Sequence, residues 1–148
     1  MSTLEKKFAS IWPSFLEMEI TRSRKASEMV GGLNNFIVIQ VVAYHHFLLL
    51  MPKTTDMDYL SAVETWKAAN PPSLDTKKIL NYSTIANLTG IDKETVRRTV
   101  QKLAELGWVS VDKTRGVSYQ PNELNQKKLI EFNRWELDAL SALMKKIF

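Results

Sequence analysis

The chain has 148 residues, of which 45% are hydrophobic and 24% charged, as expected for one globular domain or a small domain with helical additions. A net charge of +4 and a pI of about 9.3 permit nucleic-acid binding without establishing it. The chain contains no cysteine, which excludes disulfides, thiolate catalysis and cysteine-based metal sites. The first residues lack an apolar core followed by a cleavage-type site, so we expect no secretory signal and a cytoplasmic protein.

The first 35 residues favour helices with two interruptions. Proline lacks a backbone N–H, so we expect Pro13 to break or bend a helix that begins near the N-terminus. The pair Gly31-Gly32 is a clearer break. Asn34 or Asn35 is a candidate cap for the helix that follows.

The apolar run from Phe36 to Met51 is compatible with two structures. Its many β-branched residues favour a strand, whereas its length favours a helix, because strands usually run about 5–6 residues. We expect a helix packed between other elements, and no membrane span, because spanning helices need about 20 mostly apolar residues. His45 and His46 point about 100° apart on such a helix, so we expect no metal site there.

A second short helix is expected before the middle of the chain. Pro52 ends the apolar helix, and Thr55 resembles a helix cap with Asp58 in the first turn. The helix reaches about residue 69, before the Asn-Pro-Pro-Ser stretch at 70–73. One face is expected to be buried and contains Tyr59, Leu60, Val63 and Trp66.

Residues 79–92 predict a short helix, a tight turn and the start of another helix. Asn81 or Ser83 can cap the short helix, and Ser83 is the preferred candidate. Gly90 follows, where the chain must turn with a positive φ. Asp92 is a favourable cap for the next helix.

The helix expected over residues 93–106 separates into two faces at 100° per residue. The apolar face contains Val96, Thr99, Val100, Leu103 and Leu106. The opposite face contains Glu94, Arg97, Arg98, Gln101 and Glu105. Arginine can fork onto guanine or clamp phosphate, and glutamine can bridge adenine, so the polar face suits a DNA groove. The alternative is a solvated face in which Arg98 pairs with Glu94.

A hairpin is expected between Gly107 and Pro121. Two alternating strands flank a turn at residues 112–116, and the turn holds Lys113 and Arg115 at its tip. A basic tip can contact the DNA backbone or enter a minor groove. The inward positions of the two strands are expected to be Val109, Val111, Val117 and Tyr119.

Residues 122–148 predict one long helix with a coiled-coil-like seam. Two interpretations remain open: the seam packs on its own chain, or it is shared with a second subunit. The seam residues, which are the candidate dimer interface, are Ile130, Asn133, Leu137, Leu140, Met144 and Ile147.

The run IANLTGIDKETVRRTVQKLAELGWV resembles the winged helix-turn-helix of bacterial transcription regulators of the GntR, Crp and MarR kinds. Thr99 is a departure, since many relatives have an aliphatic residue there. The resemblance implies a mainly α fold with a small β-hairpin wing, divided into an N-terminal helical region (1–72), a DNA-binding region (73–121) and a dimerising C-terminal helix (122–148). Long helices on both sides resemble the MarR arrangement.

The expected function is sequence-specific binding of double-stranded DNA by a homodimeric regulator, with the helix 93–106 in the major groove. The candidate DNA contacts are Ser83, Thr84, Lys93, Glu94, Arg97, Arg98, Gln101, Lys113 and Arg115. The alternatives are a protein–protein interaction module and a replication, partition or phage protein that binds DNA without regulating transcription. We expect no enzyme activity, because no nucleophile–base pair or phosphate-binding glycine loop is present.

We expect no metal and no cofactor. A small-molecule effector is possible, but no motif supports one. The four tryptophans are expected in the core or in an interface, and they are Trp12, Trp66, Trp108 and Trp135.

Overall fold

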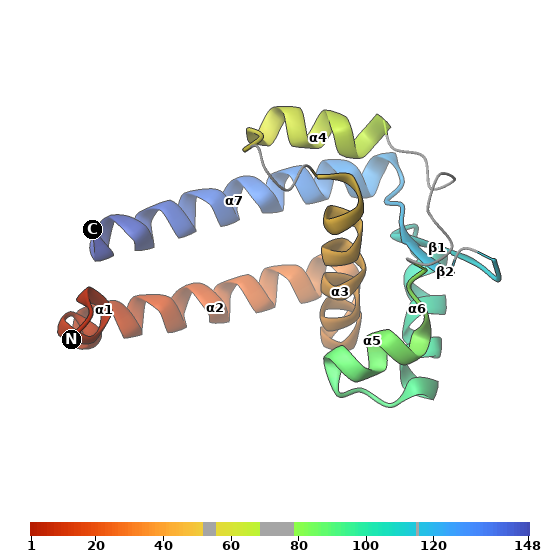
Figure 1. Ribbon diagram of the computed structural model, residues 1–148, viewed down its shortest axis with the longest axis horizontal. Helices are drawn as coiled ribbons and strands as arrows, with labels where there is room; N and C mark the ends of the chain where they lie inside the picture. Colours follow the sequence, from red (N-terminus) through yellow and green to blue (C-terminus); the bar gives the residue numbers. More distant parts are fainter. Residues whose placement is uncertain (52–55, 69–78, 115) are drawn as a thin grey trace.

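The computed structural model describes residues 1–51, 56–68, 79–114 and 116–148. The protein is mainly helical with one two-stranded antiparallel hairpin, which confirms the expected class at that level. Helices α2 (Phe8–Val30) and α7 (Glu123–Ile147) form an elongated pair that we call the arm (Figure 1). Helices α3 (Leu33–Leu50), α5 (Tyr82–Thr89) and α6 (Lys93–Glu105) pack with the hairpin into what we call the body.

The two helices of the arm run antiparallel, so both chain termini lie at its far end (Figure 1). A short helix α1 (Thr3–Lys6) precedes them and is capped by Ser2. At the far end, the Lys7 ammonium donates to the carbonyl of Ile147 at 3.3 Å, and Lys146 donates to Ser14 Oγ at 2.7 Å. Nearer the body, Arg22 and Glu136 form an ion pair at 2.6 Å.

The expected interruption at Pro13 is wrong, because α2 continues through it and the break lies at Lys7. Proline removes only the hydrogen bond to the carbonyl four residues before it. The Trp12 ring contacts Phe8 and Phe15 on the two sides of the proline, with centroids 5.3 and 5.0 Å away. These aromatic contacts span the turn that contains Pro13 and contribute to its stability.

Helix α3 confirms the helical interpretation of the apolar run. Neither asparagine caps it, contrary to expectation, because Gly32 is the cap residue and no side chain bonds there. The Asn35 side chain is buried and donates to the Val30 carbonyl at 2.8 Å. Its amide therefore stabilises the last turn of α2, which ends at Gly31 with a φ of +91°.

One side of α3 forms the centre of the body and the other is exposed. Within the described residues, α3 is a helix long and apolar enough to cross a membrane by length and composition. Phe36, Val38 and Val42 are nonetheless buried against other elements of this chain. Helix α3 packs between α2, α5, α6 and β2, as expected, but its remaining side faces solvent, where Tyr44 and Leu48 are 60% and 51% exposed.

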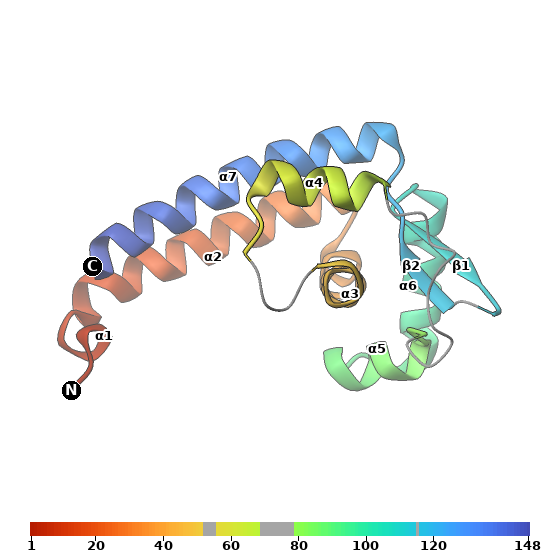
Figure 2. The ribbon, with the colours of Figure 1, turned by 45° about the horizontal axis from the view of Figure 1, so that its top comes forward.

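Helix α4 (Tyr59–Ala68) lies alongside the part of α7 that is nearest the body (Figure 2). Asp58 is its capping residue, because Asp58 Oδ1 accepts from the Ser61 N–H at 2.8 Å, whereas we expected it in the first turn. Leu60 is 69% exposed, so its assignment to the buried face is wrong. The Tyr59 hydroxyl bonds to Asn133 of α7, which rotates the adjacent Leu60 about 100° away towards solvent. Thr55 and residues 69–73 lie outside the described residues.

The short helix and turn before α6 follow the expected pattern, with one correction. Asn81 caps α5 by accepting from the Thr84 N–H at 2.8 Å, so Ser83 is not the cap. Gly90 has a φ of +75° and ends α5. Asp92 caps α6 by accepting from the Thr95 N–H at 2.9 Å.

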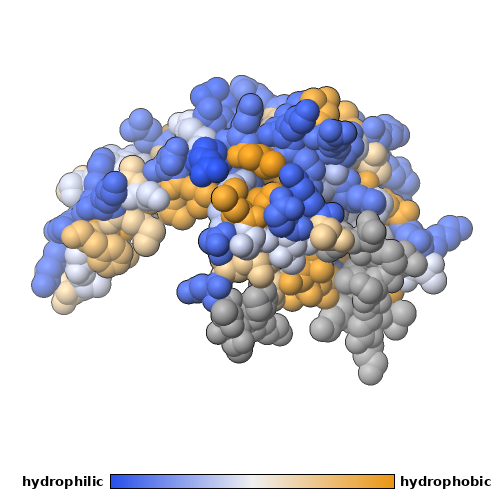
Figure 3. Space-filling model, turned by 90° about the horizontal axis from the view of Figure 1, so that it is seen from above, coloured by the Kyte–Doolittle hydropathy of each residue, from blue (hydrophilic) through white to orange (hydrophobic). Residues whose placement is uncertain are grey.

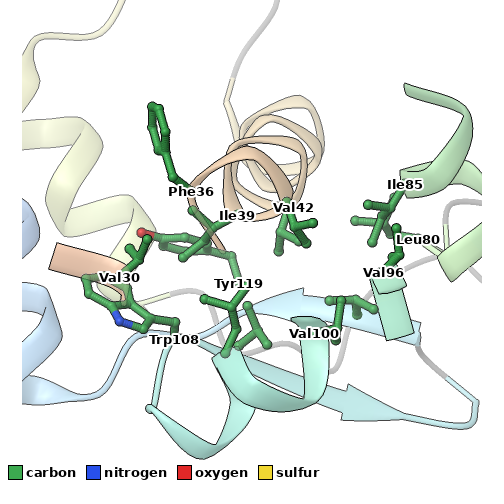
Figure 4. Packing of buried hydrophobic residues seen from close by; sticks show 14 of the residues in the cluster. Val30, Phe36, Ile39, Val42, Leu80, Ile85, Val96, Val100, Trp108 and Tyr119 are labelled. Carbon is green, nitrogen blue, oxygen red and sulfur yellow. The ribbon is translucent and has the colours of Figure 1, made fainter. Parts of the chain in front are cut away.

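The inner face of α6 is buried against α3 and α5. Figure 4 shows Val42 of α3, Ile85 of α5 and Val96 of α6 close together in the core. Val96, Val100 and Leu103 are fully buried, as expected. Leu106 is 49% exposed, contrary to expectation, because α6 ends at Glu105 and the chain turns at Gly107.

The hairpin consists of β1 (Val109–Asp112) and β2 (Gly116–Tyr119), with Val109 opposite Tyr119 and Val111 opposite Val117. Val117 is buried but Val111 is 45% exposed, so the expected burial of Val111 is wrong. The difference arises because β2 contacts α3 and also pairs with Leu80, whereas β1 is an edge strand. Gly116, with a φ of +70°, permits that pairing, since an added Cβ would clash with the Leu80 carbonyl oxygen.

Candidate nucleic-acid interface

The outer face of α6 is a row of polar side chains on a rigid support. Lys93, Glu94, Arg98 and Gln101 are exposed, and the Arg97 side chain is 40% exposed. The opposite face is fully buried, so rotation of the helix about its axis would expose apolar surface to water. The structure therefore brings together the five candidate contacts that the sequence assigned to this helix.

The two arginines of α6 differ in their surroundings. Arg97 binds Glu94 through two hydrogen bonds, with Nε donating to Oε2 at 3.0 Å and Nη2 donating to Oε1. These bonds lower the pKa of Glu94 and raise that of Arg97. The expected alternative, a pair between Glu94 and Arg98, is wrong. Arg98 makes no ion pair with any residue that the structure describes, which leaves its guanidinium available to a ligand.

A groove of about 680 Å³ runs between α6 and the start of α3. Arg98, Gln101 and Lys102 line it from α6, and Gly31 and Gly32 line it from the other side. Gly32 has no side chain with which to cap α3, so the first N–H groups of that helix carry partial positive charge. The groove also contains one acidic side chain, Glu105, so its lining carries two cationic groups against one anionic group. This excess of positive charge and the helix N-terminus favour an anionic partner such as a phosphate backbone.

The start of α5 supplies two more candidate contacts. Ser83 and Thr84 are both exposed in its first turn. The Thr84 hydroxyl donates to Asn81 Oδ1 at 3.0 Å, which leaves its oxygen lone pairs to accept. Helix α5 packs against α6, and Tyr82 in its first turn adds weakly to the raised pKa of Arg97.

The turn of the hairpin is held by Asp112. Its Oδ1 accepts from both the N–H and the hydroxyl of Thr114, each at 2.7 Å. Lys113 is exposed at this turn, as expected. Arg115 lies outside the described residues, as do Lys77 and Lys78 before α5.

The end of α6 is tied to the start of α7 by contacts that the sequence interpretation missed. The buried Asn125 side chain donates to the carbonyls of Leu106 and Gly107, at 2.8 and 3.0 Å. A Cβ on Gly107 would clash with the side-chain amide nitrogen of Asn122. This joint fixes the direction of the arm relative to α6, and no local sequence pattern signals it.

The candidate dimer residues of α7 form a partly exposed apolar surface. Leu137, Leu140 and Met144 are 40%, 47% and 48% exposed, and Ile130 and Ile147 are half-buried. Asn133 instead bonds within its own chain, to Glu136 at 3.0 Å and to Tyr59 at 3.4 Å. Asn133, in the first part of the seam, therefore makes its contacts within its own chain. The apolar residues of the later part are partly exposed to solvent.

A second apolar row on the arm was missed. It follows α1 and α2 at four-residue intervals, and all five of its members are at least 45% exposed. The spacing is a helical pattern that could have been detected from the sequence. The row contains Leu4, Phe8, Trp12, Leu16 and Ile20.

No family model, curated protein or solved structure matches this chain. In the part of the chain that the structure describes, no group of three or more histidine or acidic side chains could hold a metal ion. The expectation that the protein needs no cofactor remains a prediction.

Proposed function

We propose that the protein binds double-stranded DNA by placing α6 in the major groove. The observation that carries this proposal is the exposed Arg98 and Gln101 on a helix whose inner face is completely buried. Under this proposal α5, the Gly90 turn, α6 and the hairpin act together as a winged helix-turn-helix, in which α6 is the recognition helix and residues 112–116 are the wing.

The side chains divide by the kind of contact that they would make. Arg98 and Gln101 would bind base edges, since their planar groups match guanine and adenine in the major groove. Ser83, Thr84 and the start of α3 would bind phosphates through N–H and hydroxyl groups. Lys113 would approach the backbone or the minor groove from the wing. Arg97 would contact DNA by breaking its pair with Glu94 and binding a phosphate instead. The free-energy cost of breaking the pair is small, because water competes for the groups of an exposed ion pair.

We also propose that two copies pair through the arm. Its apolar surfaces, which include Trp12, Leu140 and Met144, are each close to half exposed in one chain. Large exposed apolar patches usually mark interaction sites. A two-fold dimer would place its two recognition helices about 34 Å apart, one turn of DNA, and would bind a near-palindromic site. Such a protein would act as a transcriptional regulator of the MarR-like kind.

One observation favours a different function. The Arg97–Glu94 pair neutralises part of the outer face of α6, as expected for a solvated surface in a protein–protein interaction module. DNA binding in replication, partition or phage biology would use the same contacts as the regulator.

Selection of bound fragments from randomised duplex DNA, at about 0.15 M salt, tests the proposal. The expected result is an enriched site with two-fold symmetry and half-sites one helical turn apart. Recovery of fragments with no shared sequence, at the affinity of the starting pool, would contradict sequence-specific binding.

A further inference from the structure

Helix α4 is attached to the rest of the protein through a small number of side chains. None of its residues is fully buried. Tyr59 and Trp66 are separated by about two turns of helix, so both project from the same face. Leu60, Glu64 and Lys67 are exposed to solvent. The position of α4 therefore depends on the contacts of its two aromatic anchors, Tyr59 and Trp66.

The first anchor, Tyr59, contacts α7. Its hydroxyl donates to Asn133 Oδ1 at 3.4 Å, and the Arg134 guanidinium lies 5.3 Å from the centre of its ring. The hydrogen bond is longer than usual, and a cation–π contact contributes little where the cation is exposed to water. Most of the attachment of α4 therefore depends on the second anchor.

The second anchor, Trp66, packs against three rings of α3 and β2, which we call its seat. The Phe47 and Tyr119 rings meet Trp66 edge-on, with centroids 4.5 and 5.1 Å away. The His46 ring lies 5.4 Å from Trp66 at an angle of 45°, and 5.7 Å from Tyr119. His46 therefore contacts both the detachable helix α4 and the β2 strand of the body.

Two nitrogen atoms at the seat are buried without a hydrogen-bond partner among the described residues. They are His46 Nε2 and Trp66 Nε1. A buried polar group without a partner costs free energy that contact with water would recover. Release of α4 would expose both nitrogens to water, so this penalty opposes docking, and the aromatic contacts of the seat must outweigh it.

A proton added to His46 meets no opposite charge at the seat. Burial and, to a smaller extent, the neighbouring His45 lower the pKa of His46 to about 4. None of the ion pairs in the described ranges involves His46. Its neighbours from other elements are the uncharged Trp66 indole and the Tyr119 phenol, whose pKa is raised by burial and by Glu136 of α7. Docking of α4 therefore opposes protonation of His46.

The region around α4 contains apolar surface that is only partly covered. Seen from the side of α4 and α7, hydrophobic residues gather in the middle of the face between hydrophilic ones (Figure 3). The core of the body does not depend on this region, because its fully buried side chains come from α2, α3, α5, α6 and the hairpin. Helix α4 can therefore leave its seat while the body stays folded.

We propose that α4 is a strap that acid releases, because protonation of His46 frees Trp66 from its seat. The docked strap keeps water from the imidazole, and the released strap exposes it, so proton uptake and release favour each other. The inference does not rest on DNA binding, because none of the residues proposed to contact DNA belongs to α4 or to the seat.

The two pKa values of His46 set the size of the effect. In the released state the imidazole is exposed and its pKa returns to the ordinary value of 6.5, whereas it is about 4 in the docked state. Protons therefore favour release as the pH falls below 6.5, and the effect is complete near pH 4. Between about pH 7.5 and pH 5, the ratio of released to docked molecules should rise about 30-fold.

A single introduced thiol measures this ratio, because the natural chain contains no cysteine. Ala62 is half-buried on the inner side of α4, and Ala68 is exposed on the same helix. The probe is 4,4′-dithiodipyridine, which reacts with thiols in mild acid as well as at neutral pH. The labelling rate of Ala62→Cys, divided by that of Ala68→Cys, should rise about 30-fold between about pH 7.5 and pH 5.

Two further substitutions, each made in both cysteine variants, identify the group that takes up the proton. His46→Gln keeps a polar side chain but cannot be protonated, so the rise in the rate ratio should be lost. His45→Gln removes the adjacent imidazole and is the control, which should retain most of the rise. A rate ratio that does not change with pH, or a rise that survives His46→Gln, would overturn the proposal.

Hydrogen exchange of the natural protein covers the case in which a variant does not fold. The released strap is a helix of 10 residues, which is marginally stable on its own in water. After correction for the direct effect of pH on exchange, the amides of α4 should lose protection between about pH 7.5 and pH 5, whereas those of α6 should keep it. Equal losses in α4 and α6 would indicate unfolding of the whole body, and unchanged protection of α4 would indicate no release. Either result would contradict the acid-released strap.

Discussion

Helices α6 and α7 are both amphipathic, but only α6 buries its apolar face completely within one chain. The inner face of α6 is completely buried, and its exposed face is polar. In α7, the apolar residues Leu137, Leu140 and Met144 are 40–48% exposed. The comparison shows that burial of the apolar face leaves only the polar face of α6 exposed to solvent. On α7, by contrast, the apolar face itself remains available to a partner.

The same contrast separates the body from the arm. The body has one continuous core that includes residues of α3, α5, α6 and both strands. The outer half of the arm is held by the buried Ile11 and Leu143 and by polar contacts at the chain termini. We therefore expect substitutions in the body to affect folding, and substitutions on the outer arm to affect association.

The largest expected effect is the loss of a core side chain from α6. Leu103→Ala should lower the free energy of unfolding by about 2–5 kcal/mol, because Leu103 is fully buried. The same change at Leu124 of α7, which is 63% exposed, should cost less than about 0.5 kcal/mol. Denaturant unfolding of both variants measures the difference. Similar losses in the two variants would contradict the contrast between the body and the arm.

A charge on the open surface of α7 should disrupt pairing while leaving the monomer folded. Met144→Glu should raise the dissociation constant of the dimer by about 30-fold or more, as a lost hot spot of roughly 2 kcal/mol does. Ser141→Glu adds the same charge at a neighbouring exposed position and is the control. Sedimentation at several concentrations measures the constant. A natural protein that stays monomeric at all concentrations would rule out the proposed dimer.

Acid should destabilise the body through His46, with a smaller effect. Burial, aided by His45, lowers the pKa of His46 from 6.5 to about 4. The unfolded chain therefore takes up a proton first, so stability is present above pH 6.5 and is lost as pH falls to about 4. The melting temperature should fall more steeply over this range in the natural protein than in His46→Gln. Parallel pH profiles would show that His46 does not contribute.

The smallest expected effect belongs to the wing. Lys113→Ala should reduce the slope of log affinity against log salt by about one unit and weaken binding to all duplexes alike. Lys127→Ala, on the exposed surface of α7, should leave the slope unchanged. Fluorescence anisotropy at several salt concentrations measures both slopes, and equal slopes would remove Lys113 from the interface.

The helical pattern was enough to predict the buried face of α6, because Val96, Val100 and Leu103 recur at the helical period. The helical pattern did not predict burial correctly where a helix ends, or where tertiary contacts set the rotation of a helix about its axis. Leu106 lies beyond the last turn of α6, and Leu60 is turned outwards by the bond between Tyr59 and Asn133. Local patterns contain neither kind of information.

The candidate site was predictable to a similar extent. Its exposed residues on α6 follow from the helical wheel, but the choice of Arg97 over Arg98 as the partner of Glu94 depends on side-chain rotamers. The contacts between the two arm helices were not predictable, because they join residues far apart in the sequence, such as Arg22 and Glu136. Such pairs form only when the arm folds back along itself.

The affinity of Arg98→Ala for a selected duplex, at fixed salt, tests the central claim most directly. Arg98 is exposed and lies outside the core, so its loss should not affect folding. If it binds a base, the variant should lose about 1–3 kcal/mol of binding free energy and discriminate less at one base pair. Lys128→Ala, an exposed cation on α7, should bind as the natural protein does. Unchanged affinity and specificity in Arg98→Ala would contradict the assignment of α6 as the DNA-reading helix.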